Sequence, residues 1–284
     1  MIEKYLNVLF YYLNIVKCDD MKVIENLNEL EGKSTYIIRE AFVKFKNPVI
    51  LWSMGKDSTT MLYLIKETMF GKIPCPVLNL DSGLEFEESY KFRDMIAKKW
   101  KLNLIVERYY PKPNTSASEV AGGKTTALKN AMDKYKFDAV FVGIRNDENQ
   151  IRGKERHMSK RDKDFIWHYG SEAEPELWDE YGISELKEGE HYRIHPILDW
   201  NELSIWRFIK IRKIPINPLY FAKNGKRFRS IGEKGYTTPI DSNADTLDKI
   251  IKEVETSEIE ERSGRDFEKE KANVMEKLRA LGYM

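Results

Sequence analysis

The residues of this chain best suited to bind phosphate lie in one short turn, SMGKDS, at positions 53–58. A turn between a strand and a helix directs backbone N–H groups and the positive end of the helix dipole toward an anion. Gly55 would let the backbone approach the anion closely, and Lys56 would add a positive charge. The hydroxyls of Ser53 and Ser58 would donate hydrogen bonds. The turn therefore predicts a phosphate site, although it lacks the G-x-x-x-x-G-K-[ST] spacing of a P-loop.

Asp57 is the unexpected member of this turn, because a carboxylate repels phosphate. It is explained if it is a ligand of Mg²⁺, or if it caps the helix that follows. The alternative for the whole turn is a plain connection between a strand and a helix, with an Asp or Ser cap and no ligand.

A second candidate region is the basic segment 143–163, which holds seven Lys or Arg residues against four Asp or Glu. Charge runs of this kind are usually solvated faces. Here the segment follows an apolar run that would end at the ligand edge of a sheet, so Arg145, Arg152, Lys154 and Arg156 could instead gather the anionic groups of a ligand. Asp147 and Glu148 could orient those arginines or bind Mg²⁺.

Strand and helix patterns alternate along the chain and would position these turns. Strands are predicted at 49–52, 77–80, 102–106, 139–142 and near 193–197, with helices between them and at 22–45. This alternation predicts an α/β fold with a Rossmann-like parallel sheet covered on both faces. Such sheets bind ligands beyond the carboxyl ends of their strands, where the strand order reverses. The turns after the first, second and fourth strands are therefore the candidate site.

We expect three parts: an N-terminal extension at 1–21, the α/β domain at 22–222, and a mostly helical C-terminal extension at 223–284. The last part contains a predicted helix whose apolar stripe is Leu247, Ile250, Ile251 and Val254. Its charged end could dock a partner, or it could simply cap the fold. Trp200 and Trp206 are predicted to pack in the core.

Composition narrows the functional classes. The net charge of the 284 residues is only +1, which disfavours nucleic acid as a partner. Two distant cysteines and four histidines without metal-ligand spacing favour a reducing cytoplasm and no zinc site. No apolar run is long enough to predict a membrane helix.

The turn at 53–58 resembles the pyrophosphate loop of N-type ATP pyrophosphatases, which cleave ATP between the α and β phosphates. Six blocks in order resemble the small subunit of heterodimeric sulfate adenylyltransferase, a relative of phosphoadenylyl-sulfate reductases. They are NPVILWSMGKDSTTML, LNLDSGLEFEESYKFRD, VGIRNDENQIRGKERHMSKRD, PELWDEYG, RIHPILDWNELSIWRFIKIRKIPINPLYFA and SEIEERSGRDFEKE. The resemblance covers roughly residues 22–284.

The resemblance implies a fold of the adenine-nucleotide α-hydrolase type and a reaction that joins AMP from ATP to sulfate, with Mg²⁺ as cofactor. It also implies a separate GTPase large subunit, because this chain contains no P-loop of its own. The implied catalytic residues are Lys56, Arg145 and Arg152. ATP would contact Ser53, Gly55, Lys56, Asp57, Ser58, Leu80, Asp81 and Gly143, and Asp57 would hold the metal. Asp81 could instead cap the next helix.

Three departures from the family pattern bear on the acceptor. The family's G-x-R-R-D-E-E reads GIRNDEN here, so that Asn146 and Asn149 replace an arginine and a glutamate. The segment 222–230 is short, and L-G-C-x-P-L-T-G becomes IGEKGYTTP at 231–239.

Three other functions remain to be weighed. A reductase of the same family would need a C-terminal cysteine, and no cysteine follows Cys75. An ATP pyrophosphatase that activates a nucleic acid for sulfur insertion would use the same loop, with 152–163 and 223–234 as its basic surface. An adenine-nucleotide sensor would bind ATP without turnover.

Overall fold

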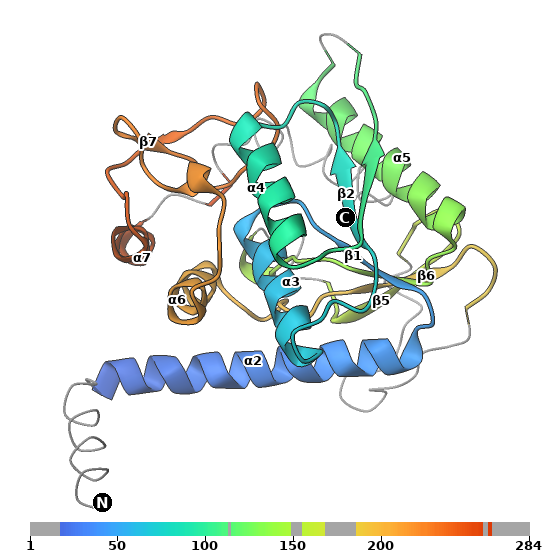
Figure 1. Ribbon diagram of the computed structural model, residues 1–284, viewed down its shortest axis with the longest axis horizontal. Helices are drawn as coiled ribbons and strands as arrows, with labels where there is room; N and C mark the ends of the chain where they lie inside the picture. Colours follow the sequence, from blue (N-terminus) through green and yellow to red (C-terminus); the bar gives the residue numbers. More distant parts are fainter. Residues whose placement is uncertain (1–17, 113–114, 149–154, 168–185, 258–260, 263–284) are drawn as a thin grey trace, which may run out of the picture.

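The protein, described here as a computed structural model, is built on a six-stranded sheet (Figure 1). The structure describes residues 18–112, 115–148, 155–167, 186–257 and 261–262. The strand order is β3-β2-β1-β4-β6-β5, and all neighbouring pairs are parallel except β5 and β6. The strands are β1 (Pro48–Leu51), β2 (Val77–Asp81), β3 (Leu104–Arg108), β4 (Ala139–Phe141), β5 (Met158–Arg161) and β6 (His191–Ile194).

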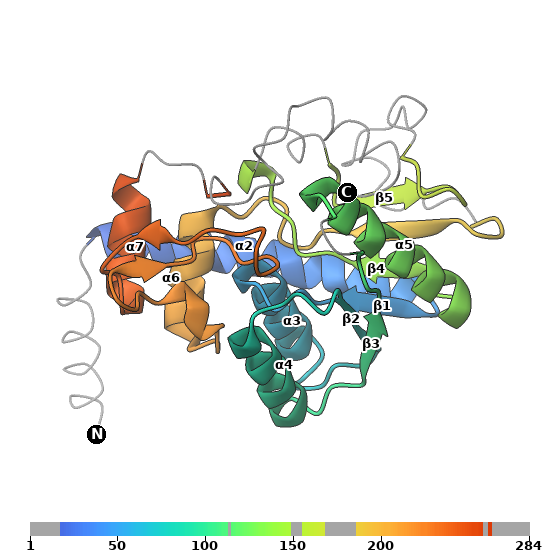
Figure 2. The same cartoon turned by 90° about the horizontal axis from the view of Figure 1, so that it is seen from above.

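Helices cover both faces of this sheet (Figure 2). They are α2 (Cys18–Lys44), α3 (Lys56–Thr68), α4 (Glu87–Lys99), α5 (Ala117–Tyr135) and α6 (Glu202–Arg212), and the last helix, α7 (Leu247–Thr256), packs on α6. Alternate strand residues such as Ile50 and Phe141 pack with α2, α3, α4 and α6 in the larger core. Val49 and Val140 point to the opposite face and pack against α5. The predicted α/β fold with a covered parallel sheet is confirmed.

The order of the strands reverses between β1 and β4. The chain runs outward from β1 through β2 to β3, and then returns to the other side of β1 as β4. A parallel sheet leaves a crevice at the carboxyl ends of the two strands that flank such a reversal. The turns that begin at Ser53 and Gly143 follow those two strands, so the topology places both candidate turns beside the crevice.

The C-terminal part adds a small second sheet and one helix. Strands β7 (Lys226–Arg227) and β8 (Ile240–Asp241) pair in antiparallel fashion. Helix α7 begins after Thr246, whose side chain accepts a hydrogen bond from the Lys249 amide. Ile250 is fully buried, and the rest of the predicted stripe packs against the main core. The stripe therefore belongs to the fold of the chain itself.

Two core predictions are confirmed, and one strand of the six-stranded sheet was missed, as were the two short strands β7 and β8. Trp200 and Trp206 are buried in the core. The edge strand β5 has the sequence MSKR, whose polar and charged residues give no strand signal, and the sequence placed it within a charged segment. Its Arg161 is nonetheless buried and pairs with Glu155. None of the helices in the described ranges has the length and apolar composition to cross a membrane.

Candidate nucleotide site

The turn after β1 leads directly into helix α3. Gly55 is the N-cap of that helix, and no side chain caps it, so the alternative in which Asp57 is the cap is wrong. The backbone reverses at Met54, whose φ is 62°, and the Met54 side chain is buried. The hydroxyls of Ser53 and Ser58 lie 3.1 Å apart across the turn. Helix α3 thus begins at the carboxyl end of β1, beside the reversal of the strand order.

Lys56 is enclosed by carboxylates. Its side chain is only 1% exposed, and its Nζ lies 3.0 Å from Asp57 Oδ2. A second contact joins the same Nζ to Glu261, from the C-terminal part of the chain. Burial disfavours the charge on Lys56, but Asp57 and Glu261 outweigh that effect and raise the pKa of Lys56 above its ordinary value. The two carboxylates therefore favour the charged form of Lys56 in its buried position.

Arg145 comes from the turn after β4 and its side chain is fully buried. Its three guanidinium nitrogens contact three carboxylates: NH1 that of Asp57, NH2 that of Glu261, and Nε that of Asp147 at 2.8 Å. The planar guanidinium fork suits this arrangement, because each nitrogen points in its own fixed direction. The structure thus brings Lys56, Asp57 and Arg145 together from two turns that are 88 residues apart.

The turn after β4 approaches helix α3 very closely. A Cβ on Gly143 would lie 2.9 Å from Ser58 Cα, closer than such atoms come in real proteins. By contrast, a Cβ on Gly55 would meet its neighbours in the protein at 3.5 Å, an ordinary contact distance. The close backbone approach that the sequence assigned to Gly55 is therefore needed, within the protein itself, at Gly143.

A further set of side chains supports the site, and two of them, Tyr220 and Glu202, were not assigned from the sequence. Tyr220, in the short helix η3 (Pro218–Tyr220), accepts a hydrogen bond of 2.9 Å from the Lys56 amide. Asp147 accepts one of 2.8 Å from the Glu202 amide. Glu202 in turn forms a buried ion pair with Arg229 at 2.8 Å. Tyr220 lies in a block quoted for the family resemblance, which was the available signal.

Glu261 and Arg262 are the least expected members. Arg262 NH1 lies 3.3 Å from Glu148, whose other oxygen accepts from the Arg145 amide. The Glu261 side chain is 7% exposed, and Arg145 and Lys56 overcome the effect of burial to lower its pKa to about 2. One of the two expectations for this segment left its polar side for a partner. Glu261 instead turns inward, because two buried cations attract it.

The remaining predicted site residues, Leu80, Asp81 and Arg152, lie outside the cluster around Arg145 or outside the described part of the chain. Asp81 ends β2 and accepts hydrogen bonds from the Gly83 amide and the Tyr90 hydroxyl. Helix α4 has Phe86 as its N-cap with no side-chain cap, so Asp81 does not cap it. Leu80 lies beside Asp81 on β2, at the same edge of the sheet. Arg152 lies outside the described residues.

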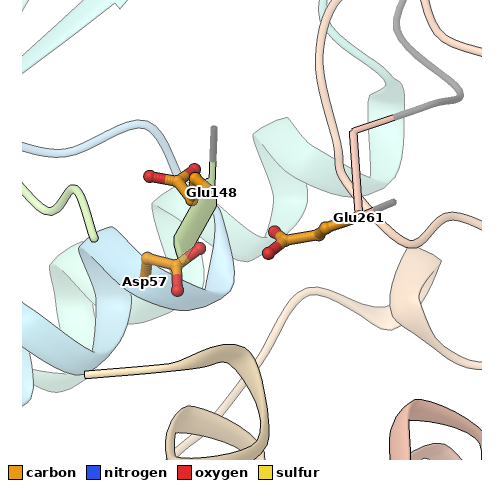
Figure 3. Close-up of side chains that lie close together, drawn as sticks. All are labelled: Asp57, Glu148 and Glu261. Carbon is orange, nitrogen blue, oxygen red and sulfur yellow. The ribbon is translucent and has the colours of Figure 1, made fainter. Parts of the chain in front are cut away.

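Three carboxylates of the site could hold a metal ion. One oxygen from each of Asp57, Glu148 and Glu261 lies within 4.8 Å of the others, and Figure 3 shows the three side chains close together. Such oxygens are the ligands that Mg²⁺ prefers, so the donor set fits this ion. In this structure the side chains of Lys56 and Arg145 contact the same carboxylate of Asp57 that would bind the ion.

The comparisons with known proteins agree on one family. A family model described as "Phosphoadenosine phosphosulfate reductase domain" matches residues 47–239. "Sulfate adenylyltransferase subunit 2" of Bacteroides fragilis (strain YCH46) is 38% identical over 92% of this chain and 98% of its own length. That of Pseudomonas aeruginosa (strain LESB58) is 37% identical over the same shares. The chain belongs to the sulfate adenylyltransferase subunit 2 family.

Solved structures show that the fold is shared more widely than this family. FMN adenylyltransferase of Candida glabrata in complex with ATP matches with a TM-score of 0.56 and 21% identity, over 76% of this chain and 64% of the other. Yeast FAD synthetase in complex with FAD matches with a TM-score of 0.52 and 16% identity, over 86% and 91%. At such identities the likeness establishes the fold alone.

Proposed function

We propose that this chain transfers AMP from ATP to sulfate, which gives adenylyl sulfate and releases pyrophosphate. The observation that carries this proposal is the meeting of Lys56 and Arg145 at the reversal of the strand order, in a member of the sulfate adenylyltransferase subunit 2 family. The name of the relatives supports sulfate as the acceptor.

The chemistry needs positive charge more than acid–base groups. Sulfate carries no proton at neutral pH, so its oxygen can attack the α-phosphorus in line without a general base. Negative charge then builds on the leaving pyrophosphate. Lys56 and the N-terminal amides of α3 stabilise that charge, because they are fixed in a buried setting before the reaction begins. Arg145 holds the acceptor and the phosphate chain in reacting positions, and Arg152 is proposed to assist it.

The cofactor is proposed to be Mg²⁺, held by Asp57 with Glu148 nearby. When bound, it would neutralise charge on the departing phosphates. Ser53, Ser58 and the backbone at Gly55 and Gly143 line the phosphate part of the site, and the edge at Leu80 and Asp81 is proposed for the adenosine.

The subunit 2 name of the relatives implies a partner subunit. We propose that the partner is a GTPase, because adenylyl sulfate is a high-energy anhydride and its formation needs a second source of free energy. We also propose that 22–222 forms the catalytic domain and that 223–284 completes the site and contacts the partner. The low cysteine content of this chain supports a reducing cytoplasm as the location of the protein.

Molybdate provides a test of the acceptor. It is tetrahedral like sulfate, and its anhydride with AMP is unstable in water. The complex purified from native cells should therefore cleave ATP to AMP and pyrophosphate when molybdate is added, at a rate that rises with molybdate concentration. Sulfate should compete with that reaction. Unchanged AMP release with both anions would contradict sulfate as the acceptor.

A further inference from the structure

The two cations of the site already hold an anion that belongs to the chain itself. The carboxylate of Glu261 bridges Lys56 Nζ and Arg145 NH2, and these contacts span 205 and 116 residues of sequence. One oxygen contacts each cation, which is the way two oxygens of a phosphate group would be held. Both cations are almost completely buried under this contact.

The charge of the cluster shows why this contact cannot simply coexist with ATP. Three cations (Lys56, Arg145 and Arg262) face four carboxylates (Asp57, Asp147, Glu148 and Glu261) in the described part of the site. A phosphate chain added to that surplus of negative charge would be repelled. Without Glu261, the surplus disappears and one donor position on each of Lys56 and Arg145 becomes available to a phosphate.

Other contacts hold this part of the chain near the site. Arg229, fixed by Glu202, donates a hydrogen bond of 2.7 Å to the Ser257 hydroxyl. Arg262 pairs with one carboxylate oxygen of Glu148, whose other oxygen accepts a hydrogen bond from the Arg145 backbone amide. Glu261 is thus tethered on both sides in sequence, and its effective concentration at the cations is high.

We propose that Glu261 is an internal competitor of the phosphate chain, a carboxylate that occupies Lys56 and Arg145 until ATP displaces it. This proposal rests on the assignment of these two cations to phosphate in the proposed function. The competitor lowers the affinity of the free subunit for polyphosphate and protects two buried cations when no nucleotide is bound. Any process that draws Glu261 away would raise that affinity.

The test measures binding of inorganic tripolyphosphate by titration calorimetry in EDTA, so that no metal contributes. Glu261→Gln keeps the shape of the side chain but removes its charge. We expect this variant to bind tripolyphosphate at least 10-fold more tightly than the parent. Glu255→Gln is the matched control, because Glu255 lies nearby in α7 and pairs with Arg207 at the surface. It should bind like the parent.

If Glu261→Gln binds tripolyphosphate as tightly as the parent or more weakly, the proposal is overturned, because removal of a competitor must raise the affinity for the ligand. The loss of an ion pair could destabilise this variant, so its thermal unfolding is measured with and without tripolyphosphate. The ligand should raise the melting temperature of Glu261→Gln more than that of the parent, and the reverse order would also overturn the proposal. Lys56→Ala separates the two ideas: if it binds tripolyphosphate like the parent, the phosphate assignment itself fails.

Discussion

At the scale of the residue, the central feature is one guanidinium that serves three carboxylates. Arg145 orients Asp57, Asp147 and Glu261 through separate nitrogens. The sequence predicted Lys56, Asp57 and Arg145 as site residues, because each lies in a turn at the carboxyl end of a strand. It did not predict Glu261, because nothing in a charge-dense segment shows which glutamate is buried. The partner of Glu261, Lys56, lies 205 residues earlier in the sequence.

The first prediction concerns Lys56→Ala. Loss of a charge-assisted contact to phosphate costs about 1.5–3 kcal/mol, which corresponds to an approximately 10- to 150-fold lower affinity for ATP. Titration calorimetry with ATP and Mg²⁺ measures this change. Lys66→Ala in the same helix is the control, because Lys66 pairs with the exposed Glu67 and should leave the affinity unchanged. Parental affinity in Lys56→Ala would refute the loop assignment.

At the scale of the element, the site depends on how closely the turn after β4 lies against α3. The sequence predicted both elements and their order. It could not locate the point of closest approach, because that distance depends on the register between β1 and β4, which pairs Pro48 with Ala139. It also missed β5, because a strand made of Met, Ser, Lys and Arg resembles a solvated loop until its partner is known.

The second prediction follows from this close approach. In Gly143→Ala the new methyl group would meet the backbone of Ser58, so the turn must move away from α3 and Arg145 must move with it. We expect adenylyl transfer to fall at least 10-fold while the chain still folds. Gly122→Ala is the control, because nothing lies within 4 Å of its Cβ in the interior of α5. That variant should be more stable by about 0.5–1 kcal/mol. An active Gly143→Ala enzyme would show that the contact does not matter.

The third prediction concerns α7. A chain that ends at Ala244 lacks the buried Ile250 and exposes the apolar surface of α6 beneath it. We expect this truncated chain to be destabilised and to aggregate, as light scattering would show. The point variant Ile250→Ala should lower the free energy of unfolding by about 2–5 kcal/mol in urea. A well-folded truncated chain that still binds the partner subunit would contradict both a capping and a docking role.

At the scale of the whole molecule, stability is coupled to pH by two buried histidines. Burial lowers the pKa of His191 to about 3 and that of His195 to about 4, from an ordinary value of 6.5. Below about pH 6.5 these two histidines therefore bind protons in the unfolded chain but stay neutral in the folded protein. Stability is complete above that pH and is lost as the pH falls toward 4. The sequence showed the histidines but could not show their burial.

The fourth prediction is the size of this effect. Between pH 6 and pH 5, each of the two histidines should lower the free energy of unfolding by up to about 1.4 kcal/mol per pH unit. His195→Asn removes one of them, and an Asn amide can still donate to the Arg156 carbonyl that His195 Nδ1 contacts at 2.7 Å. Urea unfolding across this range should give about half the parental slope. An unchanged slope would show that His195 does not titrate on unfolding.

The most direct test of the central claim is the exchange of labelled pyrophosphate into ATP, catalysed by this chain together with the partner subunit purified from the same cells. Exchange requires that adenylyl transfer to the acceptor runs in both directions. We expect exchange that depends on added sulfate and that falls at least 10-fold in a complex carrying Arg145→Ala. Exchange without sulfate, or parental exchange in the Arg145→Ala complex, would contradict the assignment of this site to sulfate adenylylation.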